Sequence, residues 1–262
     1  MSIENLSIVL PVINEEKNLE VLIPELENKL KNYFKQIEFV VVDDNSLDNT
    51  ENLMLNLKER NFKVLYVKRV TKNSLPTSIY EGIILATYEN VMWLDADGSM
   101  TAESAEKLAI EFFSNKDAVY VGSRFIEGGG YKGKLEYDKK NYFKTYFKLI
   151  NSEDSILAIL LSRVFNFILS KFLKIGIKDL TSGFILGRKK YFEKNMFLNH
   201  FYGEYFITVL SKLYINKIQL IEVGYYCQIR KFGVSKTSTN ILRMIKLSKY
   251  YFKVCINAKK EH

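Results

Sequence analysis

Histidine and cysteine are scarce in this chain of 262 residues. His200 and His262 are the only histidines, and Cys227 and Cys255 are the only cysteines. A zinc site or a Ser-His-Asp triad therefore has few residues from which it could be built. The two cysteines lack metal-binding spacing, and two in a chain of this length do not make a disulfide framework. We expect both thiols to be buried and reduced.

Signals for export and for membrane insertion are also missing. The first residues, MSIENLSIVLPVINEE, have no basic segment before the apolar run and become acidic after it, which excludes a secretory signal peptide. No stretch approaches about 20 uninterrupted apolar residues, the length that a transmembrane helix needs. We expect a cytoplasmic protein whose 47% hydrophobic content supports a substantial core.

Two common nucleotide-binding motifs are absent. The first predicted strand-to-helix turn has no glycine-rich dinucleotide loop, and the chain has no Walker lysine motif. These absences exclude an NAD-binding Rossmann unit and a P-loop NTPase.

The net charge of +8 is concentrated near the C-terminus. Nine of the 38 Lys and Arg residues lie from Arg230 onwards, against one acid, Glu261. At about 100° per residue, four cations share one face of a predicted C-terminal helix whose other sides are apolar. That pattern favours an anionic membrane surface. The alternative is a helix that packs on the domain and keeps a solvated lysine face. The four cations are Arg243, Lys246, Lys249 and Lys253.

The first half of the chain alternates strands and helices, which predicts an α/β fold with a mostly parallel sheet flanked by helices. We expect strands over 6–12, 38–42, 63–67, 91–95 and 118–122, and helices over 18–34, 48–58, 78–88 and from after Asp97 to about 113. Ligands of such open sheets bind at the carboxyl ends of the strands.

The chain is organised around residues 91–99, VMWLDADGS. Four apolar residues predict the end of a buried strand, and Asp95 and Asp97 then place both side chains on the same side of the backbone. Two close carboxylates repel unless a cation lies between them, and hard oxygen ligands suit Mg²⁺ or Mn²⁺. The alternative is an acidic turn before the next helix, with Ser99 or Thr101 as its N-cap.

Polar clusters follow other predicted strands. The acids within 14–16 and 43–46 can accept hydrogen bonds from ribose hydroxyls or a nucleobase edge, and they can equally cap helices. Ser123 and Arg124 follow the strand over 118–122, where a guanidinium can pair with a phosphate. A surface ion pair is the alternative for Arg124.

Six motifs, in this order, resemble the inverting glycosyltransferases of family 2, which have the GT-A fold: SIVLPVINEEKNL, VVDDNSLDNT, WLDADGS, GSRFIEGGG, DLTSGF and RKFGVSK. More narrowly, the chain is similar to the polyprenyl-phosphate sugar transferases, the group that includes the dolichol-phosphate mannosyltransferases. The resemblance covers about residues 5–130 and 179–237. It implies a GT-A catalytic domain over 1–229, with an amphipathic helical insertion over 131–178, followed by a phosphate-closing loop and basic helix over 230–262.

The resemblance also implies roles for the matching residues. Asp95, Asp97 and Ser99 would hold Mg²⁺ or Mn²⁺ on the donor pyrophosphate, with Asp97 as a catalytic residue. Arg124, beside Ser123 in the GSR motif, would face the acceptor phosphate or the donor diphosphate as a second catalytic residue.

Further residues would form the walls of the same site. The nucleotide pocket would be lined by Pro11, Asn14, Glu15 and Asp44. The sugar pocket would be shaped by Asp179, Thr181, Ser182 and Gly183. Arg230 and Lys236 would close over the phosphates.

The implied reaction moves one sugar from a nucleotide sugar, GDP-mannose or a UDP-hexose, to a polyprenyl phosphate. A phosphate acceptor is already anionic and needs no general base. A transferase acting on a hydroxyl of a glycan or lipid-linked saccharide is the alternative, and Glu204 would then be its catalytic base. A carboxylate at the start of a helix is an equally good interpretation of Glu204. A second alternative is a non-catalytic nucleotide-sugar-binding membrane adaptor, against which the intact DAD motif argues.

The stretch over 156–177 is apolar but interrupted by Arg163, Lys171 and Lys174, which favours an interfacial or buried helix over a membrane span. We expect it to form a membrane-facing rim with the basic, aromatic segment over 139–148 and the C-terminal helix, and this rim would receive a lipid acceptor. The predicted location is peripheral, on the cytoplasmic face of a membrane. A membrane-anchoring partner and a homo-oligomer both stay open, and the motifs give nucleic-acid binding no support.

Overall fold

The computed structural model describes residues 4–70, 73–131, 135–136, 156–228, 232 and 241–261, with only the backbone at 135–136, 156–158 and 241–247. Three predicted features lie outside this description. They are the segment over 139–148, most of residues 229–240, and the side chains of Arg243 and Lys246.

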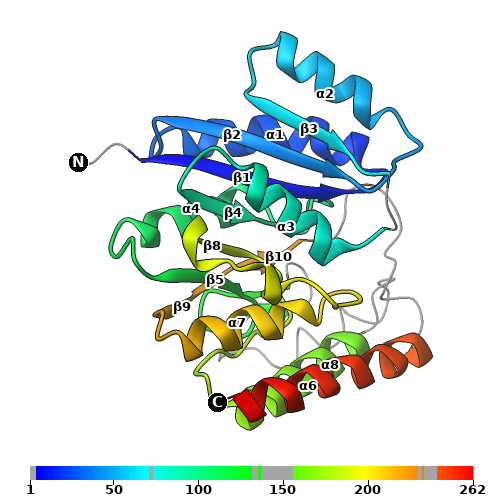
Figure 1. Cartoon of the computed structure of the whole chain (residues 1–262), viewed down its shortest axis with the longest axis vertical. Helices are drawn as coiled ribbons and strands as arrows, with labels where there is room; N and C mark the ends of the chain where they lie inside the picture. Colours follow the sequence, from blue (N-terminus) through cyan, green and yellow to red (C-terminus); the bar gives the residue numbers. More distant parts are fainter. Residues whose placement is uncertain are drawn as a thin grey trace.

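The first half of the chain alternates strands and helices, as predicted (Figure 1). Its elements are β1 (Asn5–Val12), α1 (Glu16–Leu30), β2 (Gln36–Asp43), α2 (Thr50–Glu59), β3 (Val64–Lys68), α3 (Leu75–Leu85), β4 (Asn90–Trp93), α4 (Ala102–Phe112) and β5 (Val119–Ser123). α3 begins at Leu75, before the predicted residue 78, because the fixed φ of Pro76 suits the first turn of a helix.

The second half adds helices and completes the sheet. Its elements are β6 (Gly130–Tyr131), β7 (Leu135–Glu136), α6 (Ile156–Leu173), β8 (Ile185–Arg188), the 3₁₀ helices η1 (Lys189–Tyr191) and η2 (Lys194–Met196), α7 (Tyr205–Ile215), β9 (Leu220–Gly224), β10 (Tyr226–Cys227) and α8 (Ile241–Glu261).

The main sheet has the strand order β3-β2-β1-β4-β8-β5-β9. Its strands pair in parallel except β8, which is antiparallel to both β4 and β5. The central strands are mostly apolar, in keeping with their coverage on both faces. The predicted mostly parallel α/β sheet is therefore confirmed.

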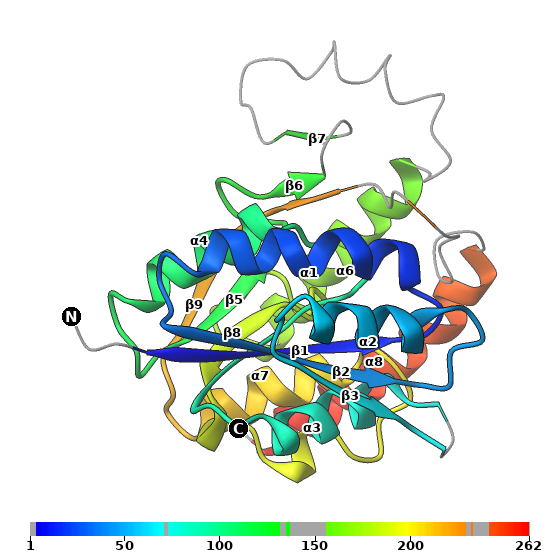
Figure 2. The same ribbon diagram turned by 90° about the horizontal axis from the view of Figure 1, so that it is seen from above.

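Two hydrophobic cores lie on opposite faces of this sheet. α1 and α4 cover one face, and α3 and α7 cover the other (Figure 2). α6 and α8 lie side by side at the outer edge of the second core, where the ring of Phe165 is 5.7 Å from that of Tyr251 and 5.4 Å from that of Phe252 (Figure 1). None of the described helices has the length and hydropathy to cross a membrane.

Candidate functional site

The predicted metal-binding carboxylates follow β4 at the carboxyl edge of the sheet. Asp97 is only 5% exposed, and its Oδ1 accepts a hydrogen bond of 2.9 Å from the backbone N–H of Ser99. Thr101 is the N-cap of α4, since its hydroxyl accepts from Ser104 N at 3.3 Å. Thr101 is thus the cap that the acidic-turn alternative expected, and this cap is compatible with either role for Asp95 and Asp97.

The donor set around these aspartates fits a hard cation that keeps open positions. Within the described ranges, no group of three or more His, Cys, Asp and Glu side chains forms a closed metal cage. Mg²⁺ and Mn²⁺ do not require one, because they commonly take one or two carboxylates and fill the remaining positions with phosphate oxygens and water. Asp95, Asp97 and the Ser99 hydroxyl supply oxygen ligands of this kind, and their metal role stays a prediction.

The turns after β1 and β2 are joined by hydrogen bonds. Asn14 has the left-handed φ of 58°, its side chain accepts from Leu47 N at 2.7 Å, and its backbone N–H donates to Ser46 Oγ at 2.8 Å. Asp43 in turn accepts from Ser46 N at 2.7 Å. Asn14 is exposed, while Pro11 and Glu15 are partly buried nearby in the sequence. The two predicted nucleotide-binding turns thus form one connected edge.

Asp44 is held by a residue that sequence reasoning missed. Arg69, which follows β3 and is 6% exposed, pairs with Asp44 Oδ1 and also donates to Glu81 at 2.8 Å and Ser78 at 2.9 Å. The other Asp44 oxygen accepts from Ser74 N at 3.0 Å. Its position after a third parallel strand could have identified Arg69 as a member of this edge.

Arg124 forms a largely buried ion pair with Asp179, in which the Asp179 side chain is fully buried and that of Arg124 is 14% exposed. The guanidinium donates from Nε and Nη2 to the two carboxylate oxygens, both at 2.8 Å, and the Arg124 backbone N–H donates to the same carboxylate at 2.9 Å. Nη2 also donates to Thr181 Oγ1 at 3.0 Å. Burial alone would lower the pKa of Arg124, but the adjacent Asp179 carboxylate raises it well above its ordinary value. Arg124 is therefore in an ion pair, as the alternative interpretation held, though not on the surface.

The residues next to this pair in the sequence are buried or have a constrained backbone. Ser182 is 5% exposed and its hydroxyl accepts from Phe184 N at 3.4 Å. Gly183 has a φ of 70°, a conformation that favours glycine. Ser123 is fully buried at the end of β5, directly before Arg124. Their contact with a sugar stays a prediction, while Arg230 and Lys236 lie outside the described residues.

Cys227 lies among the charged residues of the two motifs. Burial raises the pKa of its thiol to about 11; Arg124 opposes that shift, and Asp97, Asp95 and Asp179 add to it. The neighbouring residue, Gln228, donates its backbone N–H to Ser99 O at 2.9 Å. β10 therefore brings the DAD turn close to the Arg124 pair. Cys227 and Cys255 are both free thiols, as expected, but Cys227 is only partly buried.

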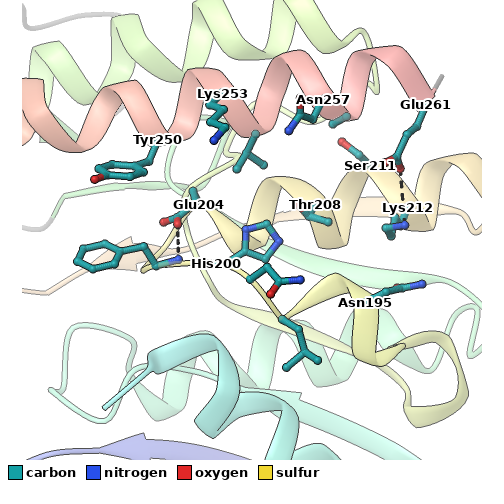
Figure 3. A pocket seen from close by; sticks show the side chains of 15 residues that line it. Asn195, His200, Glu204, Thr208, Ser211, Lys212, Tyr250, Lys253, Asn257 and Glu261 are labelled. Atoms are coloured by element: carbon teal, nitrogen blue, oxygen red, sulfur yellow. Dashed lines mark hydrogen bonds and ion pairs between the residues drawn. The ribbon is translucent and has the colours of Figure 1, made fainter. Parts of the chain in front are cut away.

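Glu204 lies in a different environment. It is 3% exposed, and its carboxylate accepts from the backbone N–H of Tyr202 at 2.9 Å and from that of Phe201. It borders a cavity of about 530 Å³ between α7 and α8, across which it faces Tyr250 and Lys253 (Figure 3). Neither aspartate of the DAD motif lines this cavity. Both carboxylate oxygens thus accept from the backbone of the loop before α7, which gives Glu204 a structural role in that loop, while its side chain does not cap α7.

The open sheet and its polar carboxyl edge define an α/β protein of the kind that binds ligands at strand ends. The sequence profile of glycosyl transferase family 2 matches residues 7–196. The chain belongs to this family, and the resemblance inferred from its six motifs is confirmed. Membership supports the predicted glycosyltransferase class.

Two curated relatives carry names of lipid-linked sugar transferases. The chain is 31% identical over 232 residues to a dolichol-phosphate mannosyltransferase of Pyrococcus furiosus, covering 88% of this chain and 58% of that protein. It is 25% identical over 250 residues to a dolichyl-phosphate beta-glucosyltransferase of Homo sapiens, covering 90% of this chain and 67% of that protein. The chain thus spans little more than half the length of the archaeal relative.

Solved structures confirm the predicted GT-A fold. Glucosyl-3-phosphoglycerate synthase from Mycobacterium tuberculosis, in complex with Mg²⁺ and UDP, superposes with a TM-score of 0.64 at 13% identity, covering 98% of this chain and 80% of that chain. The same synthase in complex with Mn²⁺, UDP and phosphoglyceric acid gives a TM-score of 0.63. At this identity the likeness establishes the fold only.

The raised pKa of Cys227 predicts slow alkylation. With a pKa of about 11, only about one thiol in a thousand is ionised at pH 8, and the thiolate is the reactive form. In a Cys255→Ser background, we expect the rate of iodoacetamide labelling at Cys227, followed by mass spectrometry, to rise about tenfold per pH unit from pH 8 to 10. Labelling at pH 8 as fast as that of a free thiol in a denatured sample would contradict the partly buried, acid-surrounded environment.

Proposed function

We propose that the chain is an inverting, metal-dependent glycosyltransferase that moves one sugar from a nucleotide sugar, GDP-mannose or a UDP-hexose, to a polyprenyl phosphate at the cytoplasmic face of a membrane. The observation that carries this proposal is the pair Asp95 and Asp97 at the end of β4 in a family 2 chain. The names of the relatives support a polyprenyl-phosphate acceptor. The structural neighbours, which are complexes with Mg²⁺ or Mn²⁺ and UDP, support a divalent cation with a nucleoside diphosphate.

Asp95, Asp97 and Ser99 would hold Mg²⁺ or Mn²⁺ against the donor pyrophosphate. The cation would supply electrostatic stabilisation of the charge that develops on the leaving nucleoside diphosphate. The acceptor phosphate oxygen forms its bond to the anomeric carbon from the opposite side as the bond to the pyrophosphate oxygen breaks, which inverts the configuration. Its anionic oxygen requires no base, in keeping with a Glu204 carboxylate that already accepts two backbone hydrogen bonds.

The donor test uses Asp97→Ala and a matched control, Asp117→Ala, which removes an exposed carboxylate from the turn before β5. With Mn²⁺ or Mg²⁺, polyprenyl phosphate and a panel of labelled nucleotide sugars, the wild-type protein should give an organic-extractable product with one donor. EDTA should abolish the signal, and Asp97→Ala should lower the rate by about 10²-fold or more, because electrostatic stabilisation of the leaving group is lost. Asp117→Ala should remain active.

Other outcomes of this assay point to other functions. Substantial activity of Asp97→Ala would remove the metal-site assignment. Release of nucleotide without labelled lipid would favour a hydroxyl acceptor and make Glu204→Gln the next variant. Binding of nucleotide sugar without any turnover would favour the non-catalytic adaptor.

The membrane part of the proposal is supported by the outer faces of α6 and α8. Large apolar side chains are exposed along one side of α6, and Phe167 is 62% exposed. Between Ile156 and Leu173 the helix has no acid, and Lys171 Nζ lies 5.7 Å from the centroid of the Phe167 ring. A face that combines apolar side chains with cations fits an anionic bilayer surface. The exposed apolar residues are Leu160, Leu161, Val164, Phe167, Ile168 and Phe172 on α6, and Tyr250, Phe252 and Ile256 on the adjacent α8.

Flotation with anionic vesicles tests this surface. Phe167→Glu combined with Phe172→Glu places two anions on the exposed face of α6, and we expect binding to drop at least tenfold because each anion opposes both burial and surface charge. The matched control is Leu55→Glu combined with Ile110→Glu, at exposed apolar positions of α2 and α4. Equal flotation of the α6 variant and wild type would remove this face from the proposal. Loss of self-association in the α6 variant, seen by sedimentation, would reassign the face to a homo-oligomer.

A further inference from the structure

The turn over residues 178–181 is held in an unusual way. Each of its four successive backbone N–H groups donates to a side-chain oxygen instead of to a backbone carbonyl of a neighbouring strand. Lys178 N and Asp179 N donate to Glu222 at 2.9 and 3.0 Å. Leu180 N donates to Asn166 Oδ1 at 2.8 Å, and Thr181 N donates to Asp179 Oδ1 at 3.3 Å. The conformation of this turn therefore depends on two distant side chains, Glu222 of β9 and Asn166 of α6.

Asn166 is a polar residue on the buried face of α6, where helix packing alone would favour an apolar side chain. It is 1% exposed and lies between apolar residues on the inner side of a helix that packs through Leu169 and Leu173. An amide in an apolar environment is unfavourable unless it is hydrogen-bonded, and asparagine is a weak helix former. Both polar atoms of the Asn166 amide are hydrogen-bonded: Oδ1 accepts from Leu180 N, and Nδ2 donates to Thr181 Oγ1 and to Ser162 O, both at 2.9 Å.

The turn that Asn166 holds carries the partner of Arg124. Asp179 receives three hydrogen bonds from Arg124, and Thr181 Oγ1 receives one from Arg124 and one from Asn166. Thr181 Oγ1 is thus a shared acceptor between the amide of α6 and the guanidinium at the end of β5. A displacement of Asn166 would release Leu180 and Thr181 and, through them, the orientation of the Asp179 carboxylate.

We propose that Asn166 is a positioning residue through which α6 fixes the Asp179–Arg124 pair. One side of α6 then carries the exposed apolar face, while the other side holds the turn that orients a charged residue of the candidate site. The hydrogen bonds from Asn166 to the turn do not depend on which reaction the protein catalyses. Their expected effect on the rate of sugar transfer rests on the proposed function. Asn166 itself need not touch any substrate.

Hydrogen exchange measures the positioning directly. In Asn166→Ala, peptides that contain residues 180 and 181 should exchange at least tenfold faster, because Leu180 N loses its acceptor. The matched control on the same helix is Ser170→Ala, which removes a partly buried hydroxyl without a hydrogen bond to the turn and should leave exchange unchanged. Asn166→Asp keeps the shape and the acceptor for Leu180 N, so it should protect residue 180 better than the alanine variant does.

Kinetics separate positioning from general destabilisation. With the nucleotide sugar that wild type uses, Asn166→Ala should lower kcat about tenfold and leave the KM for the donor within twofold, and Asn166→Asp should recover part of kcat. Unchanged exchange at 180–181, or unchanged kcat, would overturn the proposal. Faster exchange across the whole sheet in both Asn166 variants would also overturn it, since that result indicates a purely structural role. If wild type transfers no sugar, the proposed function fails and the exchange data alone decide the positioning claim.

Discussion

The largely buried ion pair between Arg124 and Asp179 is the interaction on which the arrangement of the site depends. Charges away from water are tolerated only when they are paired and fully hydrogen-bonded. Arg124 follows β5 and pairs with Asp179 in the turn before β8. The backbone of that turn is held by Glu222 of β9 and by Asn166 of α6. The ion pair and the hydrogen bonds of this turn together connect four parts of the chain.

The parallel sheet brings a second set of charges to the same edge. Asp97 follows β4, and Asp44 and Arg69 follow β2 and β3. The pKa of Cys227 responds to Arg124, Asp97, Asp95 and Asp179 together, so the DAD turn and the ion pair act on one small region. Acidic side chains at this edge suit a ligand that carries a cation, while the Arg124 guanidinium beside them is paired with Asp179. α6 lies beyond the ion pair, with its apolar face outward.

The order of strands and helices in the first half could be predicted because apolar runs and polar turns alternate along the sequence. The same reasoning located Asp95 and Asp97, which follow an apolar run directly. β8 was missed, since a four-residue antiparallel strand between β4 and β5 leaves no periodic pattern. The pairing of Arg124 with Asp179, 55 residues away, and the roles of Glu222 and Asn166 depend on tertiary contacts that no local signal encodes. The assignment of Asp97 and its neighbours to a metal stays a prediction.

Binding of Mn²⁺ in the presence of a nucleoside diphosphate tests the central claim most directly, because it needs neither the sugar nor the lipid to be known. In calorimetric titrations with GDP and with UDP, we expect one nucleotide to bind wild type much more tightly when Mn²⁺ is present. Asp97→Asn, with an unchanged circular dichroism spectrum, should lose that enhancement. Nucleotide binding that is indifferent to Mn²⁺, or an Asp97→Asn variant that retains the full enhancement, would contradict a metal-assisted donor site at the end of β4.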